Sequence, residues 1–261
     1  MVRSEEVVRG ATGDSATEVA SPPPAQSGAA ETPLDGVVKF IPDHVFAPLP
    51  QSDEVQTALA ALCAWREILV RLGFIGQESD RYGGVGFGNM SARLGADGAR
   101  RFLASGTQTS GKRAATGADF CVVERCDVAG NRVHSRGPVL PSSETMTHGA
   151  IYALSDDIRF VFHGHAPEIW TQASRLGLVA TAPEVEYGTV AMANEMHRLY
   201  RTTALPAQRM LCMLGHEDGV ITFGATAAEA GEPWARTLAQ ALLSMPASDS
   251  LDLPPTTAVM G

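Results

Sequence analysis

Two histidines separated by one residue, His163 and His165, are the side chains of this sequence best suited to hold a metal ion. They end the largely apolar segment 158–165, which we expect to be a β-strand. Because side chains of an extended chain alternate between two faces, both imidazoles project from one face and can reach one ion. A divalent ion of the zinc type takes nitrogen and carboxylate ligands, and a catalytic site leaves room for water or substrate. A pair of hydrogen-bonded core histidines is the alternative that the spacing alone leaves open.

A glutamate beside two serines, in the segment Pro141-Ser142-Ser143-Glu144, provides a carboxylate and a polar helix start. Residues 144–154 carry apolar side chains at helical spacing, which places Ser142 or Ser143 at the N-cap. A helix N-terminus offers free backbone N–H groups and the positive end of the helix dipole, so this segment suits a phosphate or a carboxylate. Glu144, together with a later histidine, could complete the metal site.

Five motifs occur in an order and at a spacing that resemble the class II aldolase/adducin family. In chain order they are Asn89-Met90-Ser91-Ala92-Arg93 after a glycine run, Pro141-Ser142-Ser143-Glu144, His163-Gly164-His165, Tyr187-Gly188-Thr189 and Gly215-His216. The similar region spans roughly residues 54–245. Within the family, the chain resembles fuculose-phosphate and rhamnulose-phosphate aldolases and related sugar-phosphate enzymes.

The resemblance implies a metal site and a reaction. His163, His165 and His216 would hold a divalent metal, Zn²⁺ first, with Mn²⁺, Co²⁺ or Fe²⁺ as alternatives, and Glu144 would be the catalytic acid/base. The reaction would be cleavage or formation of a C–C bond in a small hydroxy-carbonyl compound through a metal-bound enediolate, which makes the protein a lyase. A sugar-phosphate 4-epimerase, dehydratase or decarboxylase with the same metal site is one alternative, and a non-catalytic adducin-like module is the other.

The resemblance also implies a site for an anionic group of the substrate, such as a phosphate. The corresponding residues here are Asn89, Ser110, Gly111, Ser142 and Ser143. Ser105-Gly106 is the alternative to Ser110-Gly111, and the distance to the next strand favours the second pair. The loop is longer than in the sugar-phosphate aldolases, so the sequence leaves open whether the substrate is phosphorylated.

Residues near these motifs have two interpretations each. The segment His216-Glu217-Asp218-Gly219 is two residues longer than in the family, and its carboxylates would either approach the metal or belong to a turn, which Asp-Gly favours. His148 lies one helical turn after Glu144 and would either orient that carboxylate or be a satisfied core histidine. Tyr187 would belong to the site or to a subunit interface.

The pattern of apolar residues predicts the elements that carry these motifs. We expect helices at 53–72, 144–154, 167–176 and 192–202, and a last helical region after residue 226 that Gly231 and Pro233 divide. We expect strands at 89–94, 101–104, 120–125, 158–165, 178–182, 210–214 and 219–223. Alternating helices and hairpins predict an α/β sandwich with a central, mostly antiparallel sheet, and the three-layer α/β/α fold of the family agrees.

Composition predicts one domain with two tails. Residues 1–45 include Ser21-Pro22-Pro23-Pro24 and few large apolar side chains, so we expect a disordered N-terminal tail. The catalytic domain would span 46–250 and a short C-terminal tail 251–261. A chain of 261 residues with 44% hydrophobic residues is long enough for one large domain.

Charge and composition also exclude several partners. The net charge is −9 and no cluster of lysine or arginine occurs, which argues against nucleic acid. The sequence contains no secretory signal and no run of eighteen apolar residues, so we expect no membrane partner. Four cysteines without Cys-x-x-Cys spacing predict reduced thiols in a cytoplasmic protein. The expected partner is a small-molecule substrate, and the resemblance implies a homotetramer with its site at a subunit interface.

Overall fold

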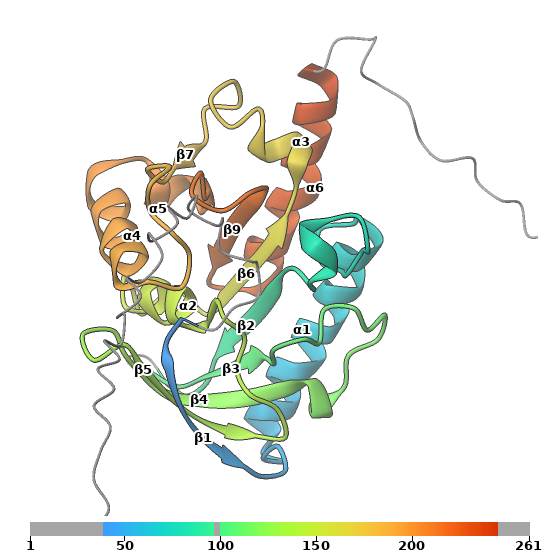
Figure 1. Ribbon diagram of the computed structural model, residues 1–261, viewed down its shortest axis with the longest axis vertical. Coiled ribbons are helices and arrows are strands. Elements are labelled where there is room, and N and C mark those ends of the chain that lie inside the picture. The colour runs from blue at the N-terminus through green and yellow to red at the C-terminus, as the bar shows by residue number, and fades with distance from the viewer. Residues whose placement is uncertain (1–38, 97–99, 245–261) are drawn as a thin grey trace, which may run out of the picture. The chain divides into compact units, whose positions relative to one another are not determined.

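A mixed β-sheet runs through the part of the chain that the computed structural model describes, residues 39–96 and 100–244 (Figure 1). Its strands are β1 (Ile41–Phe46), β2 (Asn89–Arg93), β3 (Phe102–Ser105), β4 (Phe120–Asp127), β5 (Arg132–Gly137), β6 (Phe160–His165), β7 (Val179–Ala180), β8 (Met210–Cys212) and β9 (Gly219–Gly224). They lie in the order β1-β5-β4-β3-β2-β6-β9-β8-β7. The pairs β1–β5 and β7–β8 are parallel, and the other neighbours are antiparallel.

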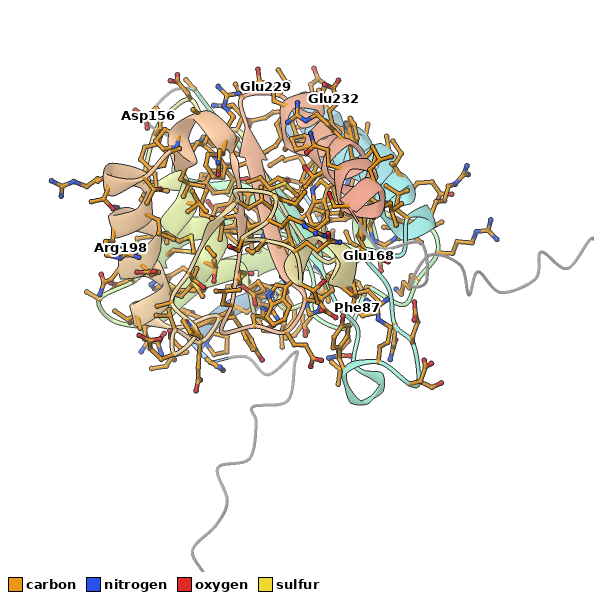
Figure 2. The ribbon with its side chains drawn as sticks, turned by 90° about the horizontal axis from the view of Figure 1, so that it is seen from above. Phe87, Asp156, Glu168, Arg198, Glu229 and Glu232 are labelled. Atoms are coloured by element: carbon orange, nitrogen blue, oxygen red, sulfur yellow. The ribbon has the colours of Figure 1, made fainter. Side chains whose placement is uncertain are left out.

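Helices cover both faces of this sheet. One face carries α1 (Asp53–Arg71), α3 (Pro167–Trp170) and α6 (Ala227–Ser244); the other carries α2 (Thr145–Tyr152), α4 (Val190–Thr202) and α5 (Leu205–Gln208). Arg198 on α4 and Glu232 on α6 lie on opposite sides of the sheet in the view from above (Figure 2). Each face has its own hydrophobic core. The predicted three-layer α/β/α sandwich with a mostly antiparallel sheet is confirmed.

Strand β6 shows how the sheet directs the two histidines. Phe162 packs into the core beneath α1 and α6, and Val161 packs into the core beneath α2 and α4. His163 and His165 follow the alternation of Val161 and therefore face the α2 side. Gly164 faces the opposite side of the sheet. A Cβ there would lie 2.6 Å from the Phe74 carbonyl oxygen, so only glycine fits at this position.

Helix α6 is continuous through Pro233, so the predicted division of the last helical region is wrong. Proline removes one backbone hydrogen bond, but the packing of this helix compensates for that loss. Trp234 donates from Nε1 to Thr222 Oγ1 on β9 at 2.7 Å. Gly231 allows close contact with α1, because a Cβ would lie 2.2 Å from the Trp65 ring. Tertiary contacts thus keep Gly231 and Pro233 within the helix, although both have low helix propensity.

Other boundaries also differ from the predicted ones. The helix expected at 167–176 ends at Trp170 and is followed by turns up to Gly177, whose φ is +64°. Strand β1 begins inside the range 1–45 that we assigned to the N-terminal tail, so that boundary falls too late. Backbone pairing with β5 holds this strand at the sheet edge. Its sequence, Ile-Pro-Asp-His-Val-Phe, does not alternate apolar and polar residues, so the pattern that identifies a strand is missing.

Residues 1–38 of the predicted N-terminal tail and all of the predicted C-terminal tail, 251–261, lie outside the described residues. None of the helices in the described ranges is long and apolar enough to span a bilayer.

Candidate functional site

Three buried histidines converge at one end of the sheet. His163 and His165 end β6, and His216 lies in the turn between β8 and β9. The ring centroids are 5.2 Å apart for His163 and His165, 5.1 Å for His163 and His216, and 4.7 Å for His165 and His216. One nitrogen of each ring lies within 4.8 Å of one nitrogen of each of the others. The three predicted ligands therefore come together, and they could hold one metal ion.

The register of the sheet explains this convergence. Strands β6 and β9 are antiparallel, and His165 pairs with Gly219, so the turn before β9 lies beside the end of β6. Within that turn, the His216 backbone N–H donates to the Met213 carbonyl at 3.0 Å, and its carbonyl accepts the Gly219 N–H at 2.9 Å. The extra residues form the turn itself: Asp218 has a φ of +58°. The turn interpretation of Asp218 agrees with this backbone, and its Oδ2 accepts a hydrogen bond from the Tyr82 hydroxyl at 2.5 Å.

Aromatic rings pack around the histidines. Tyr187 stacks on His216 with a centroid distance of 4.4 Å and an interplanar angle of 26°. Tyr82 and Phe87 contact the His165 ring at centroid distances of 4.5 and 5.4 Å. Tyr187 thus lies in the site. Tyr82 and Phe87 were not predicted from the sequence to lie there. Their only sequence signal is the glycine run between Tyr82 and Asn89, which marks a tight loop without showing where it folds.

The protonation state of the imidazoles suits metal binding. His163 Nδ1 lies 3.1 Å from the Val220 carbonyl oxygen, which can only accept, so Nδ1 carries a hydrogen and Nε2 is the nitrogen that takes either a proton or a metal ion. Burial, and then the charges of His216 and His163, hold the pKa of His165 well below its usual range. Neutral imidazoles are the form that binds a divalent metal. The donor set therefore fits an ion of the zinc type.

Glu144 lies beside the third histidine and is 2% exposed. Its Oε1 is 3.2 Å from His216 Nδ1, and its Oε2 has no hydrogen-bond partner among the described residues. Burial raises the pKa of Glu144, but the contact with His216 and the charge of His163 outweigh burial and lower it to about 2. Glu144 is consequently a carboxylate at neutral pH. It occupies the N-cap position of α2, one or two residues later than the predicted caps Ser142 and Ser143.

His148 is a buried histidine whose Nδ1 is hydrogen-bonded and whose Nε2 has no hydrogen-bond partner among the described residues. Its Nδ1 lies 2.7 Å from Ser91 Oγ, and Ser91 Oγ lies 2.8 Å from the Tyr152 hydroxyl. Burial, and then the charge of His163, lower the pKa of His148 to about 3, so the ring is neutral.

A narrow polar cavity lies between His163, Glu144 and most of the predicted anion-binding residues. It is lined by Gly86, Gly88, Asn89, Gly106, Thr107, Gln108, Ser110, Ser142, Ser143, Glu144 and His163. Four of the five predicted anion-binding residues are therefore brought together with Glu144 and His163. Asn89 donates from Nδ2 to Ser142 Oγ at 2.9 Å, which joins β2 to the start of α2.

Gly111 is the predicted anion-binding residue that does not line this cavity. It lies against Gln77, where a Cβ would be 2.3 Å from Oε1. Gly106, from the alternative loop segment, and Thr107 line the cavity instead. The other side of the cavity requires glycine at Gly88, whose φ is +84°.

A family model described as Class II Aldolase and Adducin N-terminal domain matches residues 78–237, which is more than half of the chain. No curated protein matches the chain at the sequence level.

Solved structures share the fold at low sequence identity. The l-fuculose-1-phosphate aldolase from Thermus thermophilus is 17% identical, with 71% of this chain and 91% of that chain covered and a TM-score of 0.52. A sugar-phosphate aldolase from Thermotoga maritima is 14% identical, with coverages of 72% and 93% and a TM-score of 0.55. YgbL from Klebsiella pneumoniae, whose candidate activities are aldolase, epimerase and decarboxylase, is 16% identical, with coverages of 72% and 88% and a TM-score of 0.51.

Proposed function

The chain belongs to the Class II Aldolase and Adducin family, and we propose that it is a divalent-metal-dependent aldolase acting on a small hydroxy-carbonyl compound. One observation carries this proposal. Three buried imidazoles cluster beside the Glu144 carboxylate, and one of them, His163, lines a cavity together with Glu144 and residues that offer hydroxyl and amide groups. A metal, a proton carrier and an anchor for a polar substrate group are the parts that aldol chemistry needs.

The metal ligands in this proposal are His163, His165 and His216. A divalent ion bound there would act as a Lewis acid that polarises a carbonyl and stabilises the negative charge that develops on oxygen. The Val220 carbonyl fixes the tautomer of His163, and the Tyr187 ring fixes the plane of His216. These contacts would restrain the orientation of two of the three proposed ligand rings.

Glu144 is the proposed acid/base. In the synthesis direction the carboxylate can remove a proton from carbon, and a proton is taken up by the oxygen that becomes the new hydroxyl. In the cleavage direction the substrate hydroxyl gives up its proton as the C–C bond breaks, and Glu144, once it has received a proton, delivers it to the carbon of the enediolate. Its burial keeps bulk water away from the proton during this transfer. Its position beside His216 brings it next to the proposed ligand set.

The other residues that line the cavity would anchor an anionic group of the substrate. Asn89, Ser110, Ser142 and Ser143 provide neutral donors there, and Gly111 is left out of this role because it faces Gln77. Two structures with the same fold are named as aldolases of phosphorylated sugars, which favours a phosphorylated substrate. A homotetramer and a cytoplasmic location remain predictions.

A screen of phosphorylated and free hydroxy-ketones tests the reaction. Each compound is incubated with the protein and added Zn²⁺, Mn²⁺ or Co²⁺, and released aldehyde is measured beside isomer formation. The proposal expects metal-dependent aldehyde release that Glu144→Gln abolishes. Aldehyde release by none of the compounds would overturn it.

Epimerisation or decarboxylation is the second candidate function, because YgbL, whose candidate activities include both, shares the fold. The same screen distinguishes it, since an epimerase yields an isomer without aldehyde and a decarboxylase yields CO₂. A non-catalytic module is disfavoured by the buried cluster, because burying three imidazoles and a carboxylate together costs stability without a ligand to compensate.

A further inference from the structure

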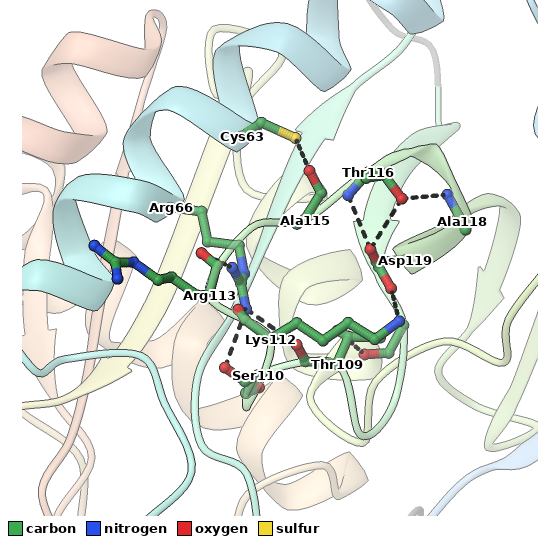
Figure 3. A network of polar contacts seen from close by, with 11 residues as sticks. Cys63, Arg66, Thr109, Ser110, Lys112, Arg113, Ala115, Thr116, Ala118 and Asp119 are labelled. Atoms are coloured by element: carbon green, nitrogen blue, oxygen red, sulfur yellow. Dashed lines mark hydrogen bonds and ion pairs between the residues drawn. The ribbon is translucent and has the colours of Figure 1, made fainter.

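A buried arginine on α1 holds the loop that lines one side of the polar cavity. Arg66 is 3% exposed, and its guanidinium donates to four carbonyl oxygens of this loop (Figure 3). The acceptors and distances are Thr109 at 3.0 Å, Ser110 at 3.0 Å, Lys112 at 2.7 Å and Arg113 at 3.4 Å. A planar guanidinium with five donors can satisfy several carbonyls at once, which an ammonium cannot match.

The same loop presents donors to the cavity on its other side. Thr107, Gln108 and Ser110 line the cavity, whereas Arg66 does not. Because the C=O and the N–H of one peptide plane point in opposite directions, turning the Thr109 carbonyl toward Arg66 turns the Ser110 N–H away from it. Arg66 thereby sets the orientation of the peptide groups next to the cavity.

The orientation of these peptide groups matters because the donors that line the cavity are neutral. Within the described structure, the lining of the cavity includes no lysine or arginine. An anion held there depends on neutral hydroxyl, amide and N–H donors, and such hydrogen bonds weaken steeply when distance or angle changes. The placement of the loop therefore has a direct effect on affinity.

Other contacts hold the ends of the loop. Ser110 donates from Oγ to the Gly88 carbonyl at 2.8 Å, which joins the loop to the glycine run. Lys112 pairs with the buried Asp119, which also accepts the Thr116 N–H at 2.8 Å. Within the loop, the Thr109 carbonyl also accepts the Lys112 N–H at 3.2 Å, so a local turn and Arg66 together orient this peptide plane. Arg66 is the side chain that joins the carbonyls of residues 109–113 to α1.

We propose that Arg66 is a positioning residue for substrate binding: it acts through the carbonyls of residues 109–113 to place the donors that bind the substrate's phosphate or carboxylate. The inference rests on the anion site of the proposed function. Arg66 touches neither Glu144 nor the histidines in this scheme, so it affects binding and leaves the chemical step unchanged.

Calorimetric titration of the full-length protein with inorganic phosphate and, separately, with glycolate tests this role and distinguishes the two anions. Arg66→Lys and Arg66→Met should each weaken the preferred anion by about tenfold or more, since hydrogen bonds to a charged group are misplaced. Arg71→Lys is the matched control on the same helix, because Arg71 is exposed and pairs only locally with Glu67. It should bind as the unsubstituted protein does.

A second measurement does not depend on how a variant folds. In the unsubstituted protein, the preferred anion should slow amide hydrogen exchange at residues 107–113. With a substrate that is turned over, Arg66→Lys should raise KM and leave kcat and metal content unchanged. Unchanged anion affinity in both Arg66 variants, no anion affinity in the unsubstituted protein, or unchanged exchange at 107–113 would each overturn the inference.

The two proposals fail separately. If no compound releases aldehyde but phosphate or glycolate binding still depends on Arg66, the proposed aldolase function fails and this inference stands. If aldehyde is released and the KM of Arg66→Lys equals that of the unsubstituted protein, the proposed aldolase function stands and this inference fails.

Discussion

Replacing His148 with glutamine should flatten the acid side of the stability profile of the metal-free protein. The pKa of His148 is lowered from 6.5 to about 3, first by burial and then by the charge of His163, although Glu144 opposes this. Between these two pH values the unfolded chain holds a proton that the native ring does not. The contribution of His148 is therefore fully present above pH 6.5 and is lost as the pH falls, by about 1.4 kcal/mol per pH unit.

Urea unfolding with a metal chelator, at about pH 7.5 and about pH 5.0, measures this effect. The glutamine variant should be less stable at the higher pH, by about 1 kcal/mol for the lost hydrogen bond to Ser91. Between pH 6.5 and the lower pH, the unsubstituted protein loses about 2 kcal/mol of unfolding free energy over about 1.5 pH units, and the variant does not. The difference in unfolding free energy should therefore change by about 2 kcal/mol in favour of the variant. His197→Gln, which removes an exposed imidazole, is the control. A difference between variant and unsubstituted protein that does not change with pH would refute a buried, neutral His148.

Three further substitutions probe the reaction, the packing and the anion site. Glu144→Gln should lower kcat by about 10²–10⁴ while metal content by mass spectrometry stays the same, and a kcat within a few-fold would count against an acid/base role. Gly231→Ala places a Cβ 2.2 Å from the Trp65 ring and should lower the unfolding free energy by about 1–3 kcal/mol in urea titrations; an unchanged midpoint would contradict the tight contact of α1 and α6. Asn89→Ala removes the bond to Ser142 and should raise KM about tenfold for a phosphorylated substrate, and an equal rise for its unphosphorylated analogue would argue against an anion site.

The parts of the site that follow from local periodicity could be predicted from the sequence. A period of two places His163 and His165 on one face of a strand, and this strand is β6. The hairpin of β8 and β9 was also expected, and it carries His216 to the same end of the sheet. The local pattern was sufficient to predict these three ligands, because the pairing of β6 with β9 brings them to the same end of the sheet.

Features that depend on packing between distant segments could not be predicted. Tyr82 and Phe87 reach His165 because the loop after α1 closes through the pairing of Gly76 with Phe87, and no local pattern reports that closure. Gly111 was placed in the anion site by its distance along the chain, but the loop turns it toward Gln77. In each case, whether the residue lies in the site depends on which distant segment packs beside it.

The packing of α6 overrides local propensity in the same way. Gly231 and Pro233 are poor helix formers, and their propensity predicts a break. In the fold, Gly231 permits the approach of the Trp65 ring, and the neighbouring Trp234 is buried against β9. The energy of these contacts exceeds the cost of one missing helical hydrogen bond.

The proposed function depends on His163, His165 and His216 holding one divalent ion. Inductively coupled plasma mass spectrometry of the protein, after equilibration with Zn²⁺ and removal of loosely bound metal, measures this binding. We expect about one ion per chain, a loss of that ion in His165→Ala, and retention in the exposed control His197→Ala. Protein without stoichiometric metal, or His165→Ala protein that binds as much metal as the unsubstituted chain, would contradict it.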